Sequence, residues 1–224
     1  MKKVLAIILL FFVFSFAYFI KNFTITKIDE NKVFSQIQTS LYTFKNNYIK
    51  AEFSFGKREE PFNDDGNPTK NVDYSLLEVE LLLQDIDTNF LFVNININNE
   101  IKRCKLRKNP FKNSYIEDIK ICDKNLNIFL INIEIFDDNF YQLKCITKLF
   151  NFSYKDAQKK SINEYKEYLL KKLNNKCKFE CYLTIAKGYD TKIRYFWKLK
   201  IITTDFETKY ALFDTNTLEL ILKT

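Results

Sequence analysis

The sequence predicts an α+β protein: an N-terminal membrane or signal helix, then a helix with an antiparallel β-meander, then a second helix with a second antiparallel meander. An uncharged run opens the chain, two stretches have helical apolar spacing, and many short alternating segments lie between Asn- and Asp-rich turns. The 224 residues suffice for one domain or two small ones. We expect a signal peptide or membrane anchor in residues 1–20, a helix plus a β-rich domain in 21–150, and a helix plus a three- to four-stranded antiparallel sheet in 151–224.

The first element is an uncharged apolar run, residues 4–20, which two lysines precede and a third lysine closes. This order is typical of a signal peptide, and Ser15 and Ala17 place small residues where cleavage after Ala17 needs them. The run is also just long enough to span a bilayer as an uncleaved anchor. Both alternatives stay open. In either, residues 4–20 contact the membrane, and the rest of the chain is expected in the periplasm or cell envelope.

The next segment, residues 29–47, is predicted to be an amphipathic helix. Its apolar positions recur at intervals of four, four and three: Val33, Ile37, Leu41 and Phe44. Residues 48–55 alternate as a strand. Residues 56–73 hold two of the three glycines and two of the three prolines, which predicts a long loop. Its carboxylates suggest a calcium site or an acid–base pair, but their spacing favours a solvated loop.

Six strand-like segments follow, each bounded by Asn, Asp or Lys, and they predict an antiparallel meander. They are residues 74–84, 89–97, 101–106, 116–122, 127–136 and 140–150.

A second helix is predicted to begin at Ser153, where Asp156 completes a sequence close to a capping box. Its apolar stripe is Ala157, Ile162, Tyr165, Leu169 and Leu173. Strands are then expected at residues 179–186, 193–203 and 208–213, with a short run at 217–222.

Residues 153–222 resemble PepSY-type modules of exported proteins. The matching features are the Ser-capped helix with an early alanine, Ala157, then a meander, then a closing strand that runs into Asp214 and Thr215. Leu218 stands where the family pattern usually has glycine. The resemblance implies a module that binds or restrains partner proteins outside the cytoplasm, and it carries over no catalytic residue.

The absence of histidine excludes several chemistries. Ser-His-Asp and Cys-His catalysis and His-ligated zinc are ruled out, and no cofactor is expected. The net charge of +7 comes almost entirely from lysine, and there is no dense basic stripe interleaved with exposed aromatics. We therefore expect no nucleic-acid partner.

Five cysteines leave at least one thiol unpaired or paired between two chains. Cys104 and Cys122 lie on predicted neighbouring strands and are expected to form a disulfide in an oxidising compartment. Cys145 and Cys181 are expected to point into the core, where they pair or stay as small apolar groups. Cys177 is the cysteine expected to stay without a partner. It should not pair with Cys181 if it already belongs to the strand, since four extended residues span about 13 Å.

Tyr195 and Trp197 share one side of a predicted strand and are candidates for a binding face, the alternative being that both belong to the core. Taken together, the sequence predicts an exported or membrane-anchored, non-catalytic binding protein of the cell envelope with a protein partner. The alternative is a carboxylate-dependent extracytoplasmic enzyme. An enzyme should show a pocket where several polar groups converge, whereas a binding module should show an exposed sheet edge or aromatic face.

Overall fold

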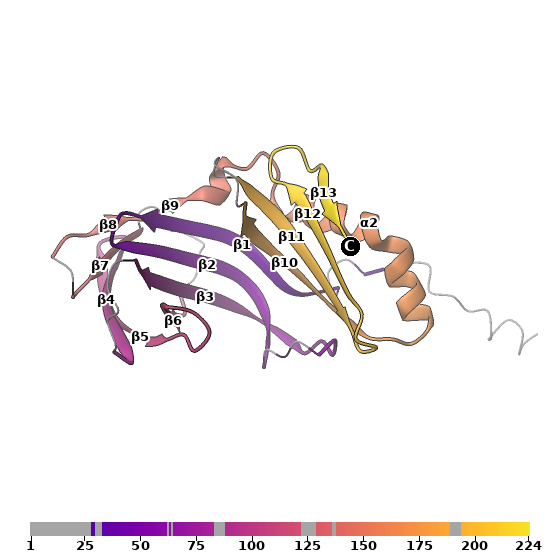
Figure 1. The fold of residues 1–224 in the computed structure, drawn as a ribbon, viewed down its shortest axis with the longest axis horizontal. Helices are drawn as coiled ribbons and strands as arrows, with labels where there is room; N and C mark the ends of the chain where they lie inside the picture. The colour runs from indigo at the N-terminus through magenta and orange to yellow at the C-terminus, as the bar shows by residue number, and fades with distance from the viewer. Residues whose placement is uncertain are drawn as a thin grey trace, which may run out of the picture.

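The computed structural model describes residues 28–29, 33–61, 63, 65–82, 88–121, 129–135, 138–188 and 194–224. In these residues the chain forms mostly one large mixed β-sheet with a single α-helix (Figure 1). The predicted α+β arrangement with two helices and an N-terminal helix is therefore wrong. The apolar run at 4–20 and the cleavage candidate Ala17 lie outside the described residues.

The elements of the first half are all strands except for one short 3-10 helix. They are β1 (Phe34–Lys45), β2 (Ile49–Glu60), β3 (Lys70–Leu81), β4 (Phe90–Ile97), β5 (Glu100–Lys108), β6 (Ser114–Asp118), β7 (Phe129–Ile133), β8 (Tyr141–Gln142), β9 (Lys144–Cys145) and η2 (Ile146–Leu149). The second half consists of α2 (Tyr154–Asn174), β10 (Phe179–Lys187), β11 (Tyr195–Thr203), β12 (Thr208–Asp214) and β13 (Leu220–Lys223).

The strands follow one path, β13-β12-β11-β10-β1-β2-β3-β6-β5-β4-β7-β8, and β9 pairs with β1. Neighbours along it are antiparallel except β1 and β10, which are parallel. Strand β1 therefore joins the two halves: its beginning pairs with β10 and its end pairs with β9. The segments predicted as separate domains at 21–150 and 151–224 share this one sheet.

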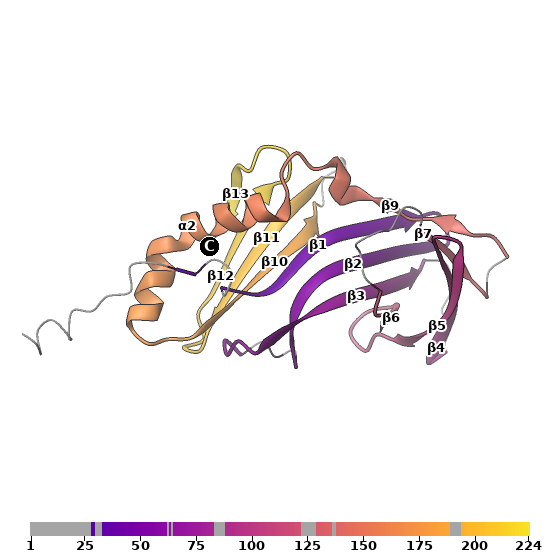
Figure 2. The same ribbon diagram turned by 180° about the vertical axis from the view of Figure 1, so that it is seen from behind.

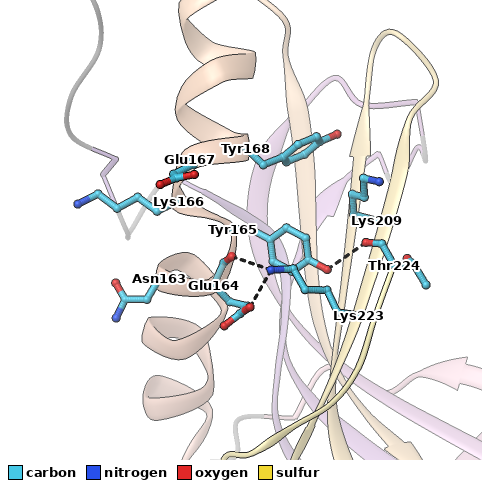
Figure 3. Close-up of a pocket in the computed structure, with 9 residues that line it drawn as sticks. All are labelled: Asn163, Glu164, Tyr165, Lys166, Glu167, Tyr168, Lys209, Lys223 and Thr224. Atoms are coloured by element: carbon cyan, nitrogen blue, oxygen red, sulfur yellow. Dashed lines mark hydrogen bonds and ion pairs between the residues drawn. The ribbon is translucent and has the colours of Figure 1, made fainter.

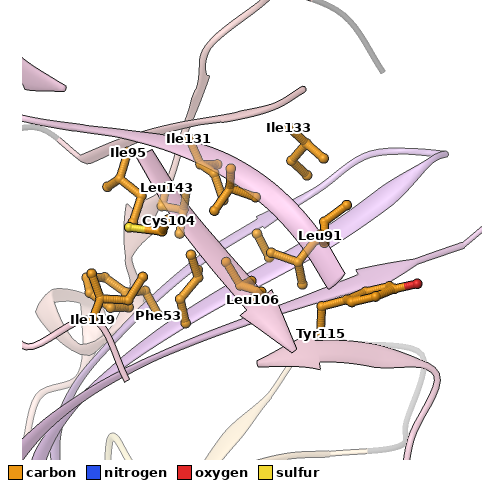
Figure 4. Packing of buried hydrophobic residues seen from close by; sticks show 14 of the residues in the cluster. Phe53, Leu91, Ile95, Cys104, Leu106, Tyr115, Ile119, Ile131, Ile133 and Leu143 are labelled. Carbon is orange, nitrogen blue, oxygen red and sulfur yellow. The ribbon is translucent and has the colours of Figure 1, made fainter. Parts of the chain in front are cut away.

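The first hydrophobic core fills the space that β1 to β9 enclose (Figure 4). Phe53 points into it from β2, Leu91 and Ile95 from β4, and Leu106 from β5, all with at most 1% of their surface exposed. Their neighbours along each strand are more exposed, which is the period-two pattern of a half-buried sheet.

The second core lies between α2 and the strands β10 to β13 (Figure 2). The helix begins as predicted: the Ser153 hydroxyl accepts from the Asp156 N–H, and the Asp156 carboxylate accepts from the Ser153 N–H at 2.9 Å. These bonds satisfy two backbone donors of the first turn. The predicted stripe through Tyr165 and Leu169 packs on Trp197, so this element is confirmed.

Within the segment 29–47, for which a helix was predicted, residues 34–45 form strand β1 instead, and a β-bulge explains the error. The register with β2 shifts between Gln38 and Ser40, so one extra residue interrupts the period of two. As a result, apolar residues on a strand recur at intervals that imitate a helix.

The predicted loop at 56–73 is largely strand as well. The ladder between β2 and β3 continues to the pair Glu60 and Lys70, which leaves residues 61–69 as the connection. Glycine is required at Gly56 because a Cβ there would lie 2.0 Å from the carbonyl oxygen of Ile37 on β1. Gly56, which the sequence analysis counted as a sign of a loop, is therefore explained by the close contact between two strands.

In the part of the chain that the structure describes, no helix has the length and apolar character needed to cross a membrane. The predicted transmembrane helix has no counterpart there.

Candidate functional site

The predicted disulfides are not formed between any described cysteines, since Cys104, Cys145, Cys177 and Cys181 are all free. A bridge between Cys145 and Cys181 is wrong because the two thiols belong to different cores. Burial raises the pKa of the Cys104 and Cys181 thiols, so both behave as small apolar groups. Cys122, the expected partner of Cys104, lies outside the described residues.

The predicted aromatic face is mostly core. Trp197 is 1% exposed, and its indole N–H donates to the carbonyl oxygen of Phe152 at 3.3 Å. The ring of Phe150 covers it, with centroids 5.6 Å apart, and also reaches Tyr195 at 6.0 Å. Tyr195 is half-buried, so of the two candidates only Tyr195 reaches the surface.

A groove of 670 Å³ lies between α2 and the end of the chain (Figure 3). The ammonium of Lys223 donates to the Glu164 carboxylate at 2.7 Å and to its backbone carbonyl at 3.3 Å. The hydroxyl of Tyr165 donates to the carbonyl of Tyr210 at 2.8 Å and lies 3.3 Å from that of Thr224. These groups satisfy one another and fix β13 against α2, so the groove is a structural contact.

The C-terminal end of α2 carries a cluster of titratable groups whose pKa values are shifted. The ammonium of Lys172 lies 2.5 Å from Asp205 and 3.0 Å from Glu207, and Tyr168 donates to Glu207 at 2.9 Å. Hydrogen bonds from Lys172 and Thr203 lower the pKa of Asp205 to about 2. Burial, followed by the bond to Glu207, raises the pKa of Tyr168 to about 12. Every group has a partner, so this cluster ties the helix to the β11–β12 turn.

Strand β5 carries five basic residues in nine, a concentration that the sequence reading missed. Most of these side chains form ion pairs or ring contacts within the protein. Arg103 forms a bidentate pair with Glu134 at 2.6 and 2.8 Å, and Arg107 lies 3.4 Å from Glu117. The Lys105 ammonium sits 3.5 Å from the centre of the Phe90 ring.

A larger cleft, of 860 Å³, separates the first turns of α2 from the strands β1, β2 and β3. Its lining residues are Phe34, Ile37, Thr39, Lys57, Asn71, Val72, Asp73, Tyr154, Lys155, Gln158 and Lys159. Three are lysines and one is an acid, which makes the cleft electropositive.

The three lysines of the cleft come from two elements. Lys57 is on β2, opposite Asp73 on β3, and Lys155 and Lys159 lie one turn apart on α2. All three are exposed. Within the described ranges, neither Lys57 nor Lys155 forms an ion pair at 4 Å or less. Their ammonium groups are therefore available to an anionic ligand.

A pair of buried carboxyl groups lies beside one end of this cleft. Glu59, near the end of β2, and Glu180, near the start of β10, are both 0% exposed. The Tyr182 hydroxyl contacts both, at 2.6 Å from Glu180 and 3.2 Å from Glu59. Asn71, which lines the cleft, is the ladder partner of Glu59.

The described residues contain no group of three or more carboxylate or thiol side chains placed to hold a metal ion. Comparisons of the chain with descriptions of known protein families, with curated proteins and with solved structures found no match. The resemblance to PepSY-type modules therefore stays a prediction.

Sequence reasoning placed Glu59 in a solvated loop and did not single out Glu180 or the lysines of the cleft. One signal could have pointed to Glu180: it stands in a strand of buried residues, FECYL, where an acid needs partners. The cleft has no such local signal, because its walls come from segments far apart in the chain.

Proposed function

We propose that the protein is an exported, non-catalytic binding protein of the cell envelope, which holds an acidic segment of a partner protein in the cleft between α2 and β1–β3. The observation that carries this proposal is the charge of the cleft: three exposed lysines surround 860 Å³ with one carboxylate among them. An acidic segment would gain attraction from each lysine without a buried ion having to be desolvated.

The walls of the cleft also suit a peptide. Phe34, Ile37 and Tyr154 supply apolar surface between the charged positions. Thr39 and Gln158 add polar side chains to the walls, and the Thr39 hydroxyl, which donates to the carbonyl of Phe55, can still accept a hydrogen bond from a backbone N–H. Apolar surface beside polar groups that fix the orientation of a ligand is a feature of binding sites.

The cleft favours a protein partner over nucleic acid. No arginine lines it, and arginine is the residue that recognises phosphates and base edges bidentately. Lysine is a compact point charge, which suits single carboxylates.

The turn between β12 and β13 supports a PepSY-like binding module. Leu218 has a φ of +56°, the left-handed conformation that favours glycine, at the position where the family pattern has glycine. The Asp214 carboxylate accepts from the N–H groups of Asn216 and Thr217 at 2.7 and 3.0 Å, which fixes the turn. The family's role in binding partner proteins agrees with the proposal.

The alternative, a carboxylate-dependent enzyme, would have to use Glu59 and Glu180, the buried pair. Both are fully enclosed, and neither lines the cleft. A substrate would need to displace the segment over them, so the geometry favours binding.

Fluorescence anisotropy with a labelled octaglutamate peptide tests the proposal. Binding should weaken by about threefold to about 150-fold when Lys57, Lys155 and Lys159 are all changed to Gln, since exposed charge pairs contribute roughly 0.2–1 kcal/mol each. Lys166→Gln, on α2 but lining the other groove, is the matched control and should leave the affinity unchanged. Equal affinity for wild type and the triple variant would contradict the proposal.

A further inference from the structure

The buried pair of Glu59 and Glu180 holds the segment 65–69 in place. The Gly66 N–H donates to Glu180 at 3.0 Å. The N–H and hydroxyl of Thr69 donate to Glu59 at 3.0 and 3.2 Å. The two carboxyl groups are thus the points at which this segment is attached to β2 and β10.

The segment is packed closely where it crosses the end of β11. Gly66 has a φ of +80°, and a Cβ added there would lie 2.6 Å from the backbone nitrogen of Thr204 and 2.7 Å from the carbonyl carbon of Thr203. Such close contact leaves little room for a partly open position. The segment is therefore either closed against the end of β11 or moved away from it.

One oxygen of the pair lacks a partner. Glu180 Oε1 is buried and forms no hydrogen bond in the described part of the protein, while the other Glu180 oxygen accepts from Gly66 and Tyr182. A buried acceptor without a partner is costly, whereas a proton on that oxygen turns it into a donor. Burial and the nearby Glu59 raise the pKa of Glu180, which favours this protonated form.

A metal ion fits the site less well than a proton. Tyr182, Gly66 and Thr69 all direct N–H or O–H groups at the carboxyl oxygens, and these donors would be repelled by a cation in the same place. A proton on Glu180 removes the repulsion between two carboxyl groups that both reach the Tyr182 hydroxyl.

From this geometry we infer that Glu59 and Glu180 form a proton-operated latch, which closes the segment 65–69 over β10 and β11 and thereby regulates the cleft that is proposed to bind an acidic segment. The route to the cleft runs through Asn71, the ladder partner of Glu59. Its amide donates to the carbonyl of Phe34 at 2.9 Å, and both residues line the cleft. This role in regulation rests on the proposed function, whereas the latch itself does not.

The direction of the pH response follows from the raised pKa of Glu180. The stabilisation is fully present below the ordinary carboxyl pKa and is lost as pH rises through the raised value, so the latch is closed in acid and opens toward alkaline pH. The other titratable and charged groups around the pair are Tyr182 and Cys181 on β10, Lys200 above the Tyr182 ring on β11, Asp65 and Lys70 beside Gly66 and Thr69, and Arg58, which pairs with Asp118.

Hydrogen exchange of the Gly66 and Thr69 amides in the full-length protein, corrected for the intrinsic pH dependence, tests the latch without any ligand. In wild type, protection should fall at least about tenfold between about pH 4 and about pH 9. Glu180→Gln should keep protection high throughout, because its amide donates where the proton was. Glu59→Gln, which removes the second charge, should also flatten the profile, and it provides a second variant should Glu180→Gln fail to fold.

Glu164→Gln, a surface acid paired with Lys223, is the control and should keep the wild-type profile. A flat profile in wild type, or a wild-type profile in both Gln variants, would overturn the latch. So would protection that depends on added calcium or on a chelator, since a cation would then hold the pair. Octaglutamate binding measured on the same samples separates the latch from the proposed binding function. If only the binding function is wrong, binding is absent while the protection of the two amides still follows the pH.

Discussion

Gly56 on β2 lies against the backbone carbonyl of Ile37 on β1, so closely that no side chain fits between them. This contact occurs where β1 crosses from the first core to the second. The two halves of the sheet are therefore joined at a point of backbone packing.

Gly56→Ala should destabilise the protein by about 1–3 kcal/mol, because the added methyl group forces the strands apart. Urea denaturation followed by circular dichroism measures this. Lys50→Ala, on the same strand but in a partly exposed ion pair, should stay within about 0.5 kcal/mol of wild type. An unchanged midpoint for Gly56→Ala would show that β1 and β2 are further apart than described.

The first core should depend strongly on its aromatic centre. Phe53 is 0% exposed, and Phe53→Ala should cost about 3–5 kcal/mol. Phe206 is 94% exposed, so Phe206→Ala should change stability by less than about 0.5 kcal/mol. Thermal unfolding of the two variants distinguishes them, and equal losses would mean that the assignment of the core is wrong.

Because of the contact between Lys172 and Asp205, the free energy of unfolding should decrease as the pH falls into the acid range. Because the pKa of Asp205 is lowered to about 2, its contribution is present above the ordinary aspartate pKa and is lost as pH falls through about 2. Lys172→Met should reduce this acid dependence, which a series of denaturation curves below about pH 4 would reveal. If Lys172→Met lost stability in acid as the wild type does, that loss would have to come from other carboxylates.

Thiol labelling checks the two cores. Cys104 and Cys181 are buried and should react only after unfolding, whereas Cys177 is partly exposed and should react in the native protein. Mass spectrometry of peptides prepared without reduction should find no bridge between Cys145 and Cys181. Such a bridge would require the two cores to merge.

Local signals in the sequence predicted the second half of the fold well. Helix α2 was found from Ser153, Asp156 and a regular stripe, because capping and the 3.6-residue period depend only on neighbouring residues. Strand β1 was taken for a helix, because its bulge and its two different partners break the alternation that marks a strand. A strand that serves two cores shows no single pattern.

Local sequence patterns could not predict the candidate site. Tyr182 and Glu59 are 123 positions apart, and only the parallel pairing of β10 with β1 brings them together. The lysines of the cleft were likewise counted as solvated surface, because their common orientation depends on how α2 lies across β1–β3. Parallel pairing between distant strands is the feature that sequence patterns specify least.

The most direct test of the account is a charge swap in the cleft. Changing Lys57, Lys155 and Lys159 to Glu together should reverse the preference of the protein, from octaglutamate in wild type to octalysine in the variant, in anisotropy titrations at low salt. The same reversal should be absent when Lys166 alone is changed to Glu. Retained octaglutamate binding by the triple variant, with an unchanged circular dichroism spectrum, would contradict the claim that this cleft binds acidic partners.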